Sequence, residues 1–376
     1  MRILELGKFY APYCGGIETL LRLFCEGLVQ KGAEVDCVVA NDRHVSVHET
    51  INGVRVHRCA SLGSLHSVSM APAFVTALRR YPADICHLHF PNPLADLSCF
   101  VGRRKIPLVI SYHSDVVSQR IAGILYRPLL NWLMRRADRI VVATPAHVNH
   151  SPVLVRHREK CDVIPFGLEL SRFLPDPDRS RRAAFLRASE GEGPVILTIG
   201  RLVGYKGHGY LLEACKDLNA RIWIVGTGPL ESDLRQQASR LRLENRVKFW
   251  GRASDGLMLD LLEACDIFAM PSISRAEAFG LVQVEAMASG KPVVNTALDS
   301  GVPLVSLDGV TGFTVPPSDP IALREAFSRL LASVELRKKL GEAGRRRAFQ
   351  EYDSDSMISR YWSCFQGLIE KRRFAG

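Results

Sequence analysis

The sequence lacks any apolar run near the roughly 18 residues that a membrane-spanning helix needs, so we expect no transmembrane segment. Its ten cysteines are scattered and form no CxxC pair or zinc-binding spacing. This excludes a zinc finger or disulfide scaffold and favours a reduced, cytoplasmic protein. Met1–Leu6 is typical of a strand rather than of a signal peptide. No basic run is interleaved with aromatic residues, so we expect no nucleic-acid partner.

Positive charge is in moderate excess, because 49 Lys and Arg outnumber 39 Asp and Glu and give a formal net charge of +10. The excess is spread over both halves of the chain and is compatible with an anionic substrate, an anionic membrane surface or simple solubility. Apolar residues make up 47% of the sequence, and 376 residues are too many for one ordinary core. We therefore expect two well-packed domains.

Short apolar runs alternate with amphipathic segments along the whole chain, which is typical of an α/β fold with parallel sheets covered by helices. In residues 16–32, apolar side chains recur at the spacing of one buried helical face. The predicted strands are 2–6, 34–40, 54–58, 85–89, 108–112, 139–143, 195–199, 221–225, 247–250, 267–270 and 292–296.

Proline, glycine and charged residues interrupt this series around residues 167–194, which we interpret as an interdomain linker followed by an irregular helix. The pattern predicts two Rossmann-like domains that face each other across a cleft, at residues 1–170 and 171–354. The last helix, residues 355–376, is expected to pack back onto the first domain. Ligands of such sheets bind beyond the carboxyl ends of the strands, which places the site in the cleft.

Two motifs of the first half follow predicted strands. Gly15 and Gly16 precede a helix, where backbone N–H groups can approach a phosphate, but they form no GxGxxG fingerprint of a dinucleotide-binding dehydrogenase. His113 ends a strand and could face a substrate, although a structural histidine is the alternative. His87 and His89 share one strand face, but no third ligand has matching spacing, so we expect no metal.

A third motif joins two cations to a glycine-rich loop, with Arg201 after Gly200 and Lys206 before Gly207. Arginine offers a planar fork for two phosphate oxygens, and lysine adds a point charge. Together they could neutralise a diphosphate without a metal ion. The spacing is not that of a Walker loop, and the alternative interpretation is a solvated basic loop.

The fourth motif is the most informative. A loop carries Glu277 and leads into a helix that we expect to begin near Gly280. The N–H groups of Phe279, Gly280 and Leu281 could donate to sugar hydroxyls or to phosphate. Glu277 could accept hydrogen bonds from sugar hydroxyls, and Glu285 from a ribose diol. The alternative is a helix-capping loop with a surface glutamate.

In this order the motifs resemble those of glycosyltransferase family 4, the retaining transferases of GT-B fold. The resemblance rests above all on the glutamate pair Glu277 and Glu285 and on the segment 200–207. Segments 165–173 and 312–317 also occur in the family's order. The similarity covers about residues 1–365, nearly the whole chain.

The resemblance implies a role for each residue of the second half. Arg201 and Lys206 would bind the donor diphosphate, Glu277 and the amides after it would grip the transferred hexose, and Glu285 would hold the ribose. The chain departs from the family's pattern at Thr227, where many relatives have an acidic residue in the corresponding turn.

The first half would complete the site. Gly15 and Gly16 would bring backbone N–H groups to the phosphates, and His113 would lie beside the reacting sugar. Transfer with retention would proceed by front-face attack, in which the leaving phosphate helps to take the acceptor proton. No metal ion, no cofactor and no enzymic nucleophile would then be needed.

The implied function is a metal-independent hexosyltransferase of polysaccharide, lipopolysaccharide or glycolipid assembly. GDP-mannose and UDP-glucose are both plausible donors, and the acceptor would be a glycan or a lipid-linked glycan. A sugar-nucleotide epimerase or hydrolase of the same fold and a non-catalytic sugar-nucleotide-binding protein are the alternatives.

The acceptor would bind the first domain, where the segment 124–136 could lie on an anionic membrane surface at the inner face of the cell membrane, or simply pack on its sheet. Its apolar residues are Leu125, Leu129, Leu130, Trp132, Leu133 and Met134.

Overall fold

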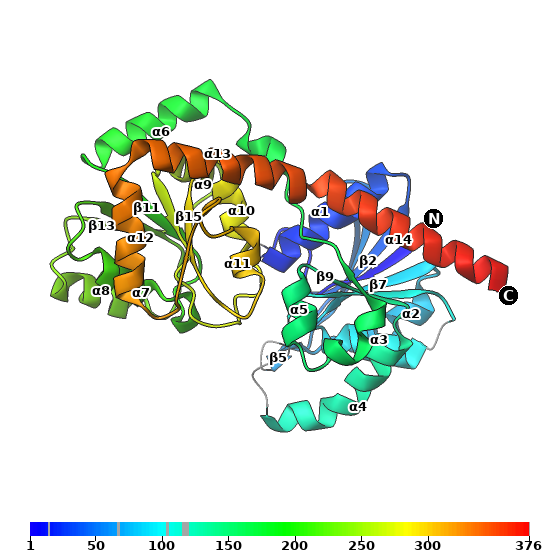
Figure 1. Cartoon of the computed structure of the whole chain (residues 1–376). Coiled ribbons are helices and arrows are strands. Elements are labelled where there is room, and N and C mark those ends of the chain that lie inside the picture. Colours follow the sequence, from blue (N-terminus) through cyan, green and yellow to red (C-terminus); the bar gives the residue numbers. More distant parts are fainter. Residues whose placement is uncertain (14–15, 66–67, 103–104, 115–119, 376) are drawn as a thin grey trace. The chain divides into compact units, whose positions relative to one another are not determined.

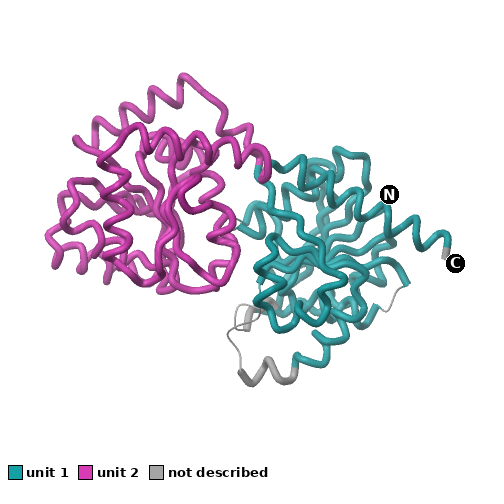
Figure 2. Tube along the Cα trace, viewed as in Figure 1, with its two compact units in different colours: residues 1–168, 353–376 teal, residues 169–352 magenta. Residues whose placement is uncertain are grey.

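The computed structural model describes residues 1–13, 16–65, 68–102, 105–114 and 120–375. These residues form two compact units, which Figure 2 shows in different colours. Unit 1 comprises residues 1–168 and 353–376, and unit 2 comprises residues 169–352. The boundaries expected from the sequence, at 170 and 354, lie two residues further along the chain.

An eight-stranded sheet forms the centre of unit 1, in the order β10-β9-β8-β7-β1-β2-β4-β3. Its neighbouring strands run parallel except for the antiparallel pair β3 and β4. In chain order the strands are β1 (Arg2–Leu6), β2 (Glu34–Ala40), β3 (Val47–Ile51), β4 (Val54–Cys59), β7 (Ile85–Phe90), β8 (Leu108–Tyr112), β9 (Arg139–Val142) and β10 (Cys161–Val163). A separate hairpin is formed by β5 (Ser64–Leu65) and β6 (Val68–Ser69).

Helices connect most of the parallel strands of unit 1, as Figure 1 shows, whereas β2 and β4 are joined through β3. The α-helices are α1 (Gly16–Gln30), α2 (Ala77–Arg80), α3 (Pro93–Gly102), α4 (Arg120–Arg136), α5 (Pro145–His150) and α14 (Ser354–Ala375). Two short 3₁₀ segments are η1 (Pro72–Thr76) and η2 (Leu154–Lys160).

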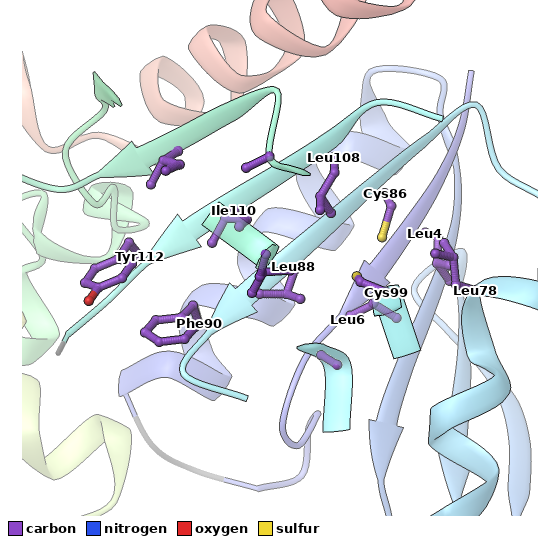
Figure 3. Packing of buried hydrophobic residues seen from close by; sticks show 14 of the residues in the cluster. Leu4, Leu6, Leu78, Cys86, Leu88, Phe90, Cys99, Leu108, Ile110 and Tyr112 are labelled. Atoms are coloured by element: carbon purple, nitrogen blue, oxygen red, sulfur yellow. The ribbon is translucent and has the colours of Figure 1, made fainter. Parts of the chain in front are cut away.

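One face of the unit 1 sheet is purely apolar in its centre. Figure 3 shows Leu6 of β1, Leu88 and Phe90 of β7 and Ile110 of β8 packed together, with Cys99 of α3 beside them. Because side chains alternate between the two faces of a strand, the residues between these apolar positions point to the opposite face.

The opposite face of the same sheet is covered by α1 and α14. Phe24 of α1 and Phe365 of α14 belong to one core cluster with Val109 of β8. The C-terminal helix therefore packs back onto the sheet of unit 1. His87 and His89, the alternate residues of β7, lie on this second face, and both are buried.

Unit 2 is built on a six-stranded parallel sheet in the order β13-β12-β11-β14-β15-β16. Its strands are β11 (Val195–Ile199), β12 (Arg221–Val225), β13 (Val247–Gly251), β14 (Ile267–Ala269), β15 (Val293–Thr296) and β16 (Gly312–Val315). Its helical segments are η3 (Leu170–Phe173), α6 (Pro177–Ser189), η4 (Gly204–Lys206), α7 (His208–Cys215), α8 (Glu231–Arg240), α9 (Asp255–Ala264), α10 (Leu281–Ala288), α11 (Val302–Val305), α12 (Pro320–Ala332) and α13 (Val334–Glu351).

The boundary between the two units lies inside residues 167–194, as expected, but the interpretation of this segment as a long linker with an irregular helix is wrong. Most of the segment belongs to unit 2, and α6 is a regular helix that packs on α9. The side chain of Asp176 caps the first turn of α6 by accepting a hydrogen bond from the N–H of Asp178. Pro177 suits the first helical position because proline has no N–H that would need an acceptor. Arg179 is buried and forms an ion pair with Glu263 of α9. The prolines and charges that suggested a linker are therefore capping and pairing residues.

Helix α4 was considered as a membrane-facing segment. Leu133 and Met134 are 0% exposed and lie in the core of unit 1, and Leu130 and Trp132 are partly buried against that core. These four side chains pack on the protein interior, which supports the alternative that the segment packs on its sheet. Among the helices in the described ranges, none combines the length and apolar character needed to cross a bilayer.

Candidate functional site

In unit 2 the strands β11 and β14 mark the point where the chain changes direction across the sheet. Strands β12 and β13 lie on one side of β11, whereas β14, β15 and β16 follow on the other side. Ligands of parallel α/β sheets bind beyond the carboxyl ends of the strands at such a switch point. The two loops that leave it, residues 200–207 and 270–280, carry most of the residues predicted in the second half of the chain.

Lys206 and Glu277, predicted from separate motifs, form an ion pair in unit 2. Lys206 Nζ lies 2.5 Å from Glu277 Oε2, and the two side chains are 14% and 12% exposed. Ser272 Oγ donates a hydrogen bond to the same carboxylate oxygen at 3.2 Å. The N–H of Ile273 donates to the carbonyl of Tyr205 at 2.8 Å, which ties the two loops together. Because the pair is largely withdrawn from water, either charge would be costly to leave alone.

Gly207 determines how closely these two loops approach. It has a φ of 70°, in the left-handed region that favours glycine. A Cβ atom at this position would lie 1.9 Å from the carbonyl oxygen of Pro271. The position therefore requires glycine, and the close backbone contact holds Lys206 at the distance where it meets Glu277.

Arg201 occupies the same loop in a different environment. Its side chain is exposed, and within the described ranges its guanidinium has no ion pair or hydrogen bond. Its carbonyl accepts a hydrogen bond from His208 Nε2 at 3.3 Å, which anchors the backbone to α7. Burial lowers the pKa of His208 to about 4, so this donor is a neutral ring at physiological pH. The arginine head group is therefore available to an anionic ligand.

The glycine-rich turn after β12 supports the Arg201 loop by backbone packing. Gly226 has a φ of 131°, and a Cβ atom there would lie 2.0 Å from the carbonyl oxygen of Gly200. The N–H of Leu202 donates to the carbonyl of Thr227 at 3.0 Å. The turn therefore shapes the loop that carries Arg201.

Helix α10 presents its amino end beside Glu277 in sequence. Gly280 caps the helix with a φ of 76°. Leu281 and Val282 open the first turn, where N–H groups have no acceptor within the helix and carry the positive end of its dipole. The ring of Phe279 is 3% exposed and packs edge-on against Tyr352 at a centroid distance of 5.8 Å. Its side chain is therefore a packing group, and the ligand-binding potential lies in the backbone after it.

Glu285 lies one turn further along α10 and is half-buried. Burial raises the pKa of this carboxyl group to about 7, the Arg172 guanidinium opposes the rise and the Asp255 carboxylate adds to it. In the part of the chain that the structure describes, its carboxyl group has no hydrogen-bond partner. Glu285 is therefore an unsatisfied acceptor whose charge changes near neutral pH.

In unit 1 the corresponding switch point lies between β1 and β7, which are neighbours in the sheet. His113 directly follows β8, the strand next to β7. Its backbone N–H donates to the carbonyl of Phe90 at 3.0 Å. The ring is 6% exposed and stacks on Phe166 at a centroid distance of 5.3 Å. Gly16 is the exposed first residue of α1, whereas Gly15 lies outside the described residues.

A buried polar network lies next to His113 and was missed by sequence reasoning. Glu5 Oε2 lies 2.8 Å from His87 Nδ1 and 3.3 Å from His89 Nε2. Ser111 Oγ lies 2.8 Å from His87 Nε2 and 2.6 Å from the Tyr361 hydroxyl of α14. Thus β1, β7, β8 and α14 each contribute to one connected set of side chains.

Glu5 corrects the expectation that the two histidines of β7 have no third ligand. Its donor atom lies within 4.8 Å of those of His87 and His89, close enough for the group to hold a metal ion. Glu5 and His87 are register partners on adjacent strands, which spacing along the sequence cannot show. The available signal was a single carboxylate among the otherwise apolar buried residues of β1.

Burial controls the charge of these groups. It lowers the pKa values of His87, His89 and His113 to about 3 each, so all three rings are neutral at physiological pH. Burial also raises the pKa of Glu5 above its usual range, although its hydrogen bond to His89 opposes the rise. The network is therefore a set of neutral rings connected by hydrogen bonds.

Comparison with protein families assigns both halves of the chain to glycosyl transferases. The family model described as glycosyl transferases group 1 matches residues 182–347. A model described as a glycosyl transferase 4-like domain matches residues 15–167. These two matches include His113, Lys206, Glu277 and Glu285, but not Glu5 or Tyr361.

Known proteins with similar sequences are also glycosyltransferases. The chain is 31% identical over 378 residues to O-antigen chain mannosyltransferase C of Escherichia coli, covering 99% of this chain and 100% of the relative. It is 34% identical over 346 residues to D-rhamnosyltransferase WbpZ of Pseudomonas aeruginosa, covering 91% of this chain and 89% of the relative.

Among solved structures, sucrose-phosphate synthase from Thermosynechococcus elongatus superimposes with a TM-score of 0.81 at 22% identity, covering 98% of this chain and 99% of that chain. This likeness concerns the fold, and the prediction of an α/β protein of GT-B fold is confirmed.

The close contact between Gly207 and Pro271 can be tested by measuring the stability of a Gly207 variant. We expect Gly207→Ala to destabilise unit 2 by at least about 1–2 kcal/mol, the cost of a left-handed conformation for a residue with a Cβ atom, because the contact with Pro271 adds to that cost. Urea denaturation followed by tryptophan fluorescence measures the change. Gly204→Ala is the matched control, since a Cβ atom there meets nothing within 4 Å. Equal stability of the two variants would contradict the close loop contact.

Proposed function

Because this chain belongs to the glycosyl transferases group 1 family, we propose that it transfers a mannose-type hexose from a nucleotide diphosphate sugar to a glycan or lipid-linked acceptor. The family assignment makes it a glycosyltransferase; the donor, the retention of configuration and the independence from metal are the proposal. The relatives described above, a mannosyltransferase and a D-rhamnosyltransferase, favour a mannose-type sugar over a glucose-type one. The observation that carries the proposal is the ion pair between Lys206 and Glu277.

Lys206 binds the diphosphate of the donor. In the unliganded protein its ammonium group is neutralised by Glu277 at 2.5 Å. A diphosphate replaces that carboxylate as the partner of Lys206, and the exposed guanidinium of Arg201 and the N–H groups of Leu281 and Val282 add further positive potential. These groups stabilise the negative charge that grows on the leaving diphosphate, which is the role a divalent cation plays elsewhere.

Glu277 is released by the same exchange. Once its bond to Lys206 is replaced, its carboxylate accepts hydrogen bonds from hydroxyls of the transferred hexose, while Ser272 continues to hold one of its oxygens. Binding of the donor therefore couples recognition of the diphosphate to recognition of the sugar. A nucleotide without a sugar leaves the freed carboxylate without a partner, which disfavours its binding.

Glu285 accepts a hydrogen bond from the ribose, and unit 1 binds the acceptor. His113 contacts the transferred sugar as a neutral ring. Attack by the acceptor hydroxyl on the face from which the diphosphate leaves retains the configuration of the sugar, and the leaving phosphate takes the acceptor proton. No side chain then has to act as a nucleophile, in contrast to a retaining hydrolase with two close carboxylates.

Removing either member of the ion pair tests this function. We expect Lys206→Met and Glu277→Gln each to lower kcat for mannosyl transfer by about 10²–10³-fold, the usual effect of removing one preorganised group that stabilises developing charge. Transfer is measured with radiolabelled GDP-mannose and a lipid-linked or oligosaccharide acceptor. Lys216→Met, at an exposed lysine in the same unit, is the matched control and should keep wild-type kcat.

A folded Lys206→Met or Glu277→Gln variant with near-wild-type turnover would refute the assignment. Release of free mannose that does not depend on the acceptor would instead identify a hydrolase. Binding of GDP-mannose with no turnover in any acceptor mixture would identify a non-catalytic binding protein.

Metal independence has its own test. If Lys206, Arg201 and the amides of α10 neutralise the diphosphate, transfer should continue at an unchanged rate in excess EDTA. Initial rates are compared with and without the chelator after dialysis of the enzyme. A loss of activity that Mn²⁺ or Mg²⁺ restores would show that a cation performs this neutralisation.

The raised pKa of Glu285 predicts a pH dependence. A carboxyl group is ionised above its pKa, so the form that best accepts ribose hydroxyls becomes populated as pH rises through about 7. At pH 6 about a tenth of the groups are ionised, so we expect KM for the donor to be several-fold to about ten-fold higher there than at pH 8. Steady-state kinetics across this range measure it. Glu285→Gln should remove this dependence, and an unchanged profile in that variant would assign the titration to another group.

A further inference from the structure

The buried network of unit 1 reaches His113 through His89. His89 Nδ1 lies 3.0 Å from His113 Nε2, and the two rings are stacked with an interplanar angle of 11°. At its other nitrogen, His89 lies 3.3 Å from Glu5 Oε2. The side chain of Glu5 is 0% exposed, and those of His89 and His113 are at most 6% exposed. A continuous hydrogen-bonded path therefore leads from the centre of the sheet to the candidate site residue.

The first branch of the network runs from Tyr361 through Ser111 and His87 to Glu5. The chemistry of these side chains determines which atom donates in each of its hydrogen bonds. A neutral imidazole has one N–H donor and one acceptor nitrogen. The Tyr361 hydroxyl, the more acidic of the two hydroxyls, donates to Ser111 Oγ, and Ser111 in turn donates to His87 Nε2. His87 Nδ1 then carries the proton and donates it to Glu5 Oε2. On this branch the shared carboxylate oxygen is an acceptor.

The second branch runs from His113 through His89 to Glu5, and its hydrogen bonds are also donated toward Glu5. Glu5 Oε2 accepts from His89 Nε2–H, which leaves His89 Nδ1 as an acceptor for His113 Nε2–H. His113 Nδ1 is then a bare nitrogen, and it has no hydrogen-bond partner among the residues that the structure describes. The reverse assignment would bury an unpaired N–H on His113 and point a lone pair of His89 at the Glu5 oxygen. Buried N–H groups without an acceptor are rarer and more costly than unpaired acceptors.

The distance between Glu5 and His87 fits a hydrogen bond better than a metal site. Two ligands of one tetrahedral zinc ion, each about 2.0–2.1 Å from it, lie roughly 3.3 Å apart. His87 Nδ1 and Glu5 Oε2 are closer, at 2.8 Å, and this is an ordinary hydrogen-bond distance.

We propose that Glu5 and His89 are positioning residues that hold His113 in a single tautomer, with Nε2 protonated and Nδ1 bare, so that Nδ1 accepts a hydrogen bond from a hydroxyl of the bound sugar. The contact with sugar rests on the proposed function, whereas the tautomer is a property of unit 1 alone. A hydroxyl donor from the ligand would satisfy His113 Nδ1, which has no hydrogen-bond partner among the described residues. Glu5 and His89 themselves touch no reacting atom.

Nitrogen NMR of the full-length protein labelled with ¹⁵N-histidine tests the tautomer without any substrate. His113→Asn identifies the resonances of His113 by their loss. We expect wild-type His113 to show a protonated Nε2 and an unprotonated Nδ1. A protonated Nδ1, or an averaged signal from both tautomers, would overturn the proposal.

Variants of the relay test its direction. His89→Phe keeps a ring but removes both nitrogens, so His113 should show averaged tautomers. His89→Gln can still donate to Glu5 and accept from His113, so it should restore the single tautomer. Tyr361→Phe removes only the hydroxyl at the far end of the other branch and is the matched control, with His113 unchanged. An unchanged His113 spectrum in a folded His89→Phe variant would overturn the relay, and if that variant does not fold, the wild-type and His89→Gln spectra still decide the question.

Activity and ligand titration separate this proposal from the proposed function. Addition of GDP-mannose should shift the His113 Nδ1 resonance, and His89→Phe should lower kcat about ten-fold with a smaller change in KM, while His89→Gln recovers most of the loss. Absence of transfer by the wild-type enzyme would refute the function but leave the tautomer test intact. A His113 Nδ1 resonance unmoved by saturating GDP-mannose would refute the sugar contact. One equivalent of tightly bound metal that disappears in Glu5→Gln would replace the relay with a metal site.

Discussion

The ion pair between Lys206 and Glu277 is the interaction on which the candidate site of unit 2 depends. Its two members leave the sheet at the switch point between β11 and β14, and a backbone contact that only glycine permits at position 207 brings them together. The pair is largely buried, so each charge needs a partner. A donor that carries both a diphosphate and a sugar can provide a partner for each, whereas neither half of that donor can do so alone.

The buried polar network of unit 1 contains neutral rings, in contrast to the ion pair of unit 2. At its own switch strands the buried groups are neutral rings and a carboxyl group joined by hydrogen bonds, and no cation takes part. Such a network costs little when every member is paired, but it is costly when one member is not. Among the described residues, two buried atoms of this network have no hydrogen-bond partner, Glu5 Oε1 and His113 Nδ1. His113 lies at the end of the network, where a ligand can complete the set. Unit 2 thus has charged side chains that a ligand can pair with, and unit 1 has a hydrogen-bond acceptor on His113.

The sequence pattern was sufficient to predict features that depend only on residues close together in the chain. Strands 2–6, 108–112 and 195–199 were predicted with the bounds that the structure has, because alternation and apolar runs report on the burial of each strand by itself. The position of Lys206 and Glu277 in loops after strands also followed from local signals. The fold itself came from the alternation of strands and helices together with a family resemblance.

What sequence reasoning missed depends on contacts between distant segments. Glu5 meets His87 only because β1 and β7 are adjacent in the sheet, although the two residues are 82 positions apart in the sequence. Helix α6 was expected to be irregular, because its capping and ion-pairing residues resemble those of a loop when the contact with α9 is not known. The packing of the Phe279 ring against Tyr352 inside unit 2 likewise joins residues far apart in the sequence and could not be predicted from it.

The central claim is that a donor diphosphate takes the place of Glu277 beside Lys206. A crystal structure of the protein with GDP-mannose bound tests it most directly. The account predicts a phosphate oxygen within hydrogen-bond distance of Lys206 Nζ and of an N–H in the first turn of α10, with Glu277 turned to the mannose hydroxyls. Phosphates bound elsewhere, with Lys206 and Glu277 still in contact, would contradict it.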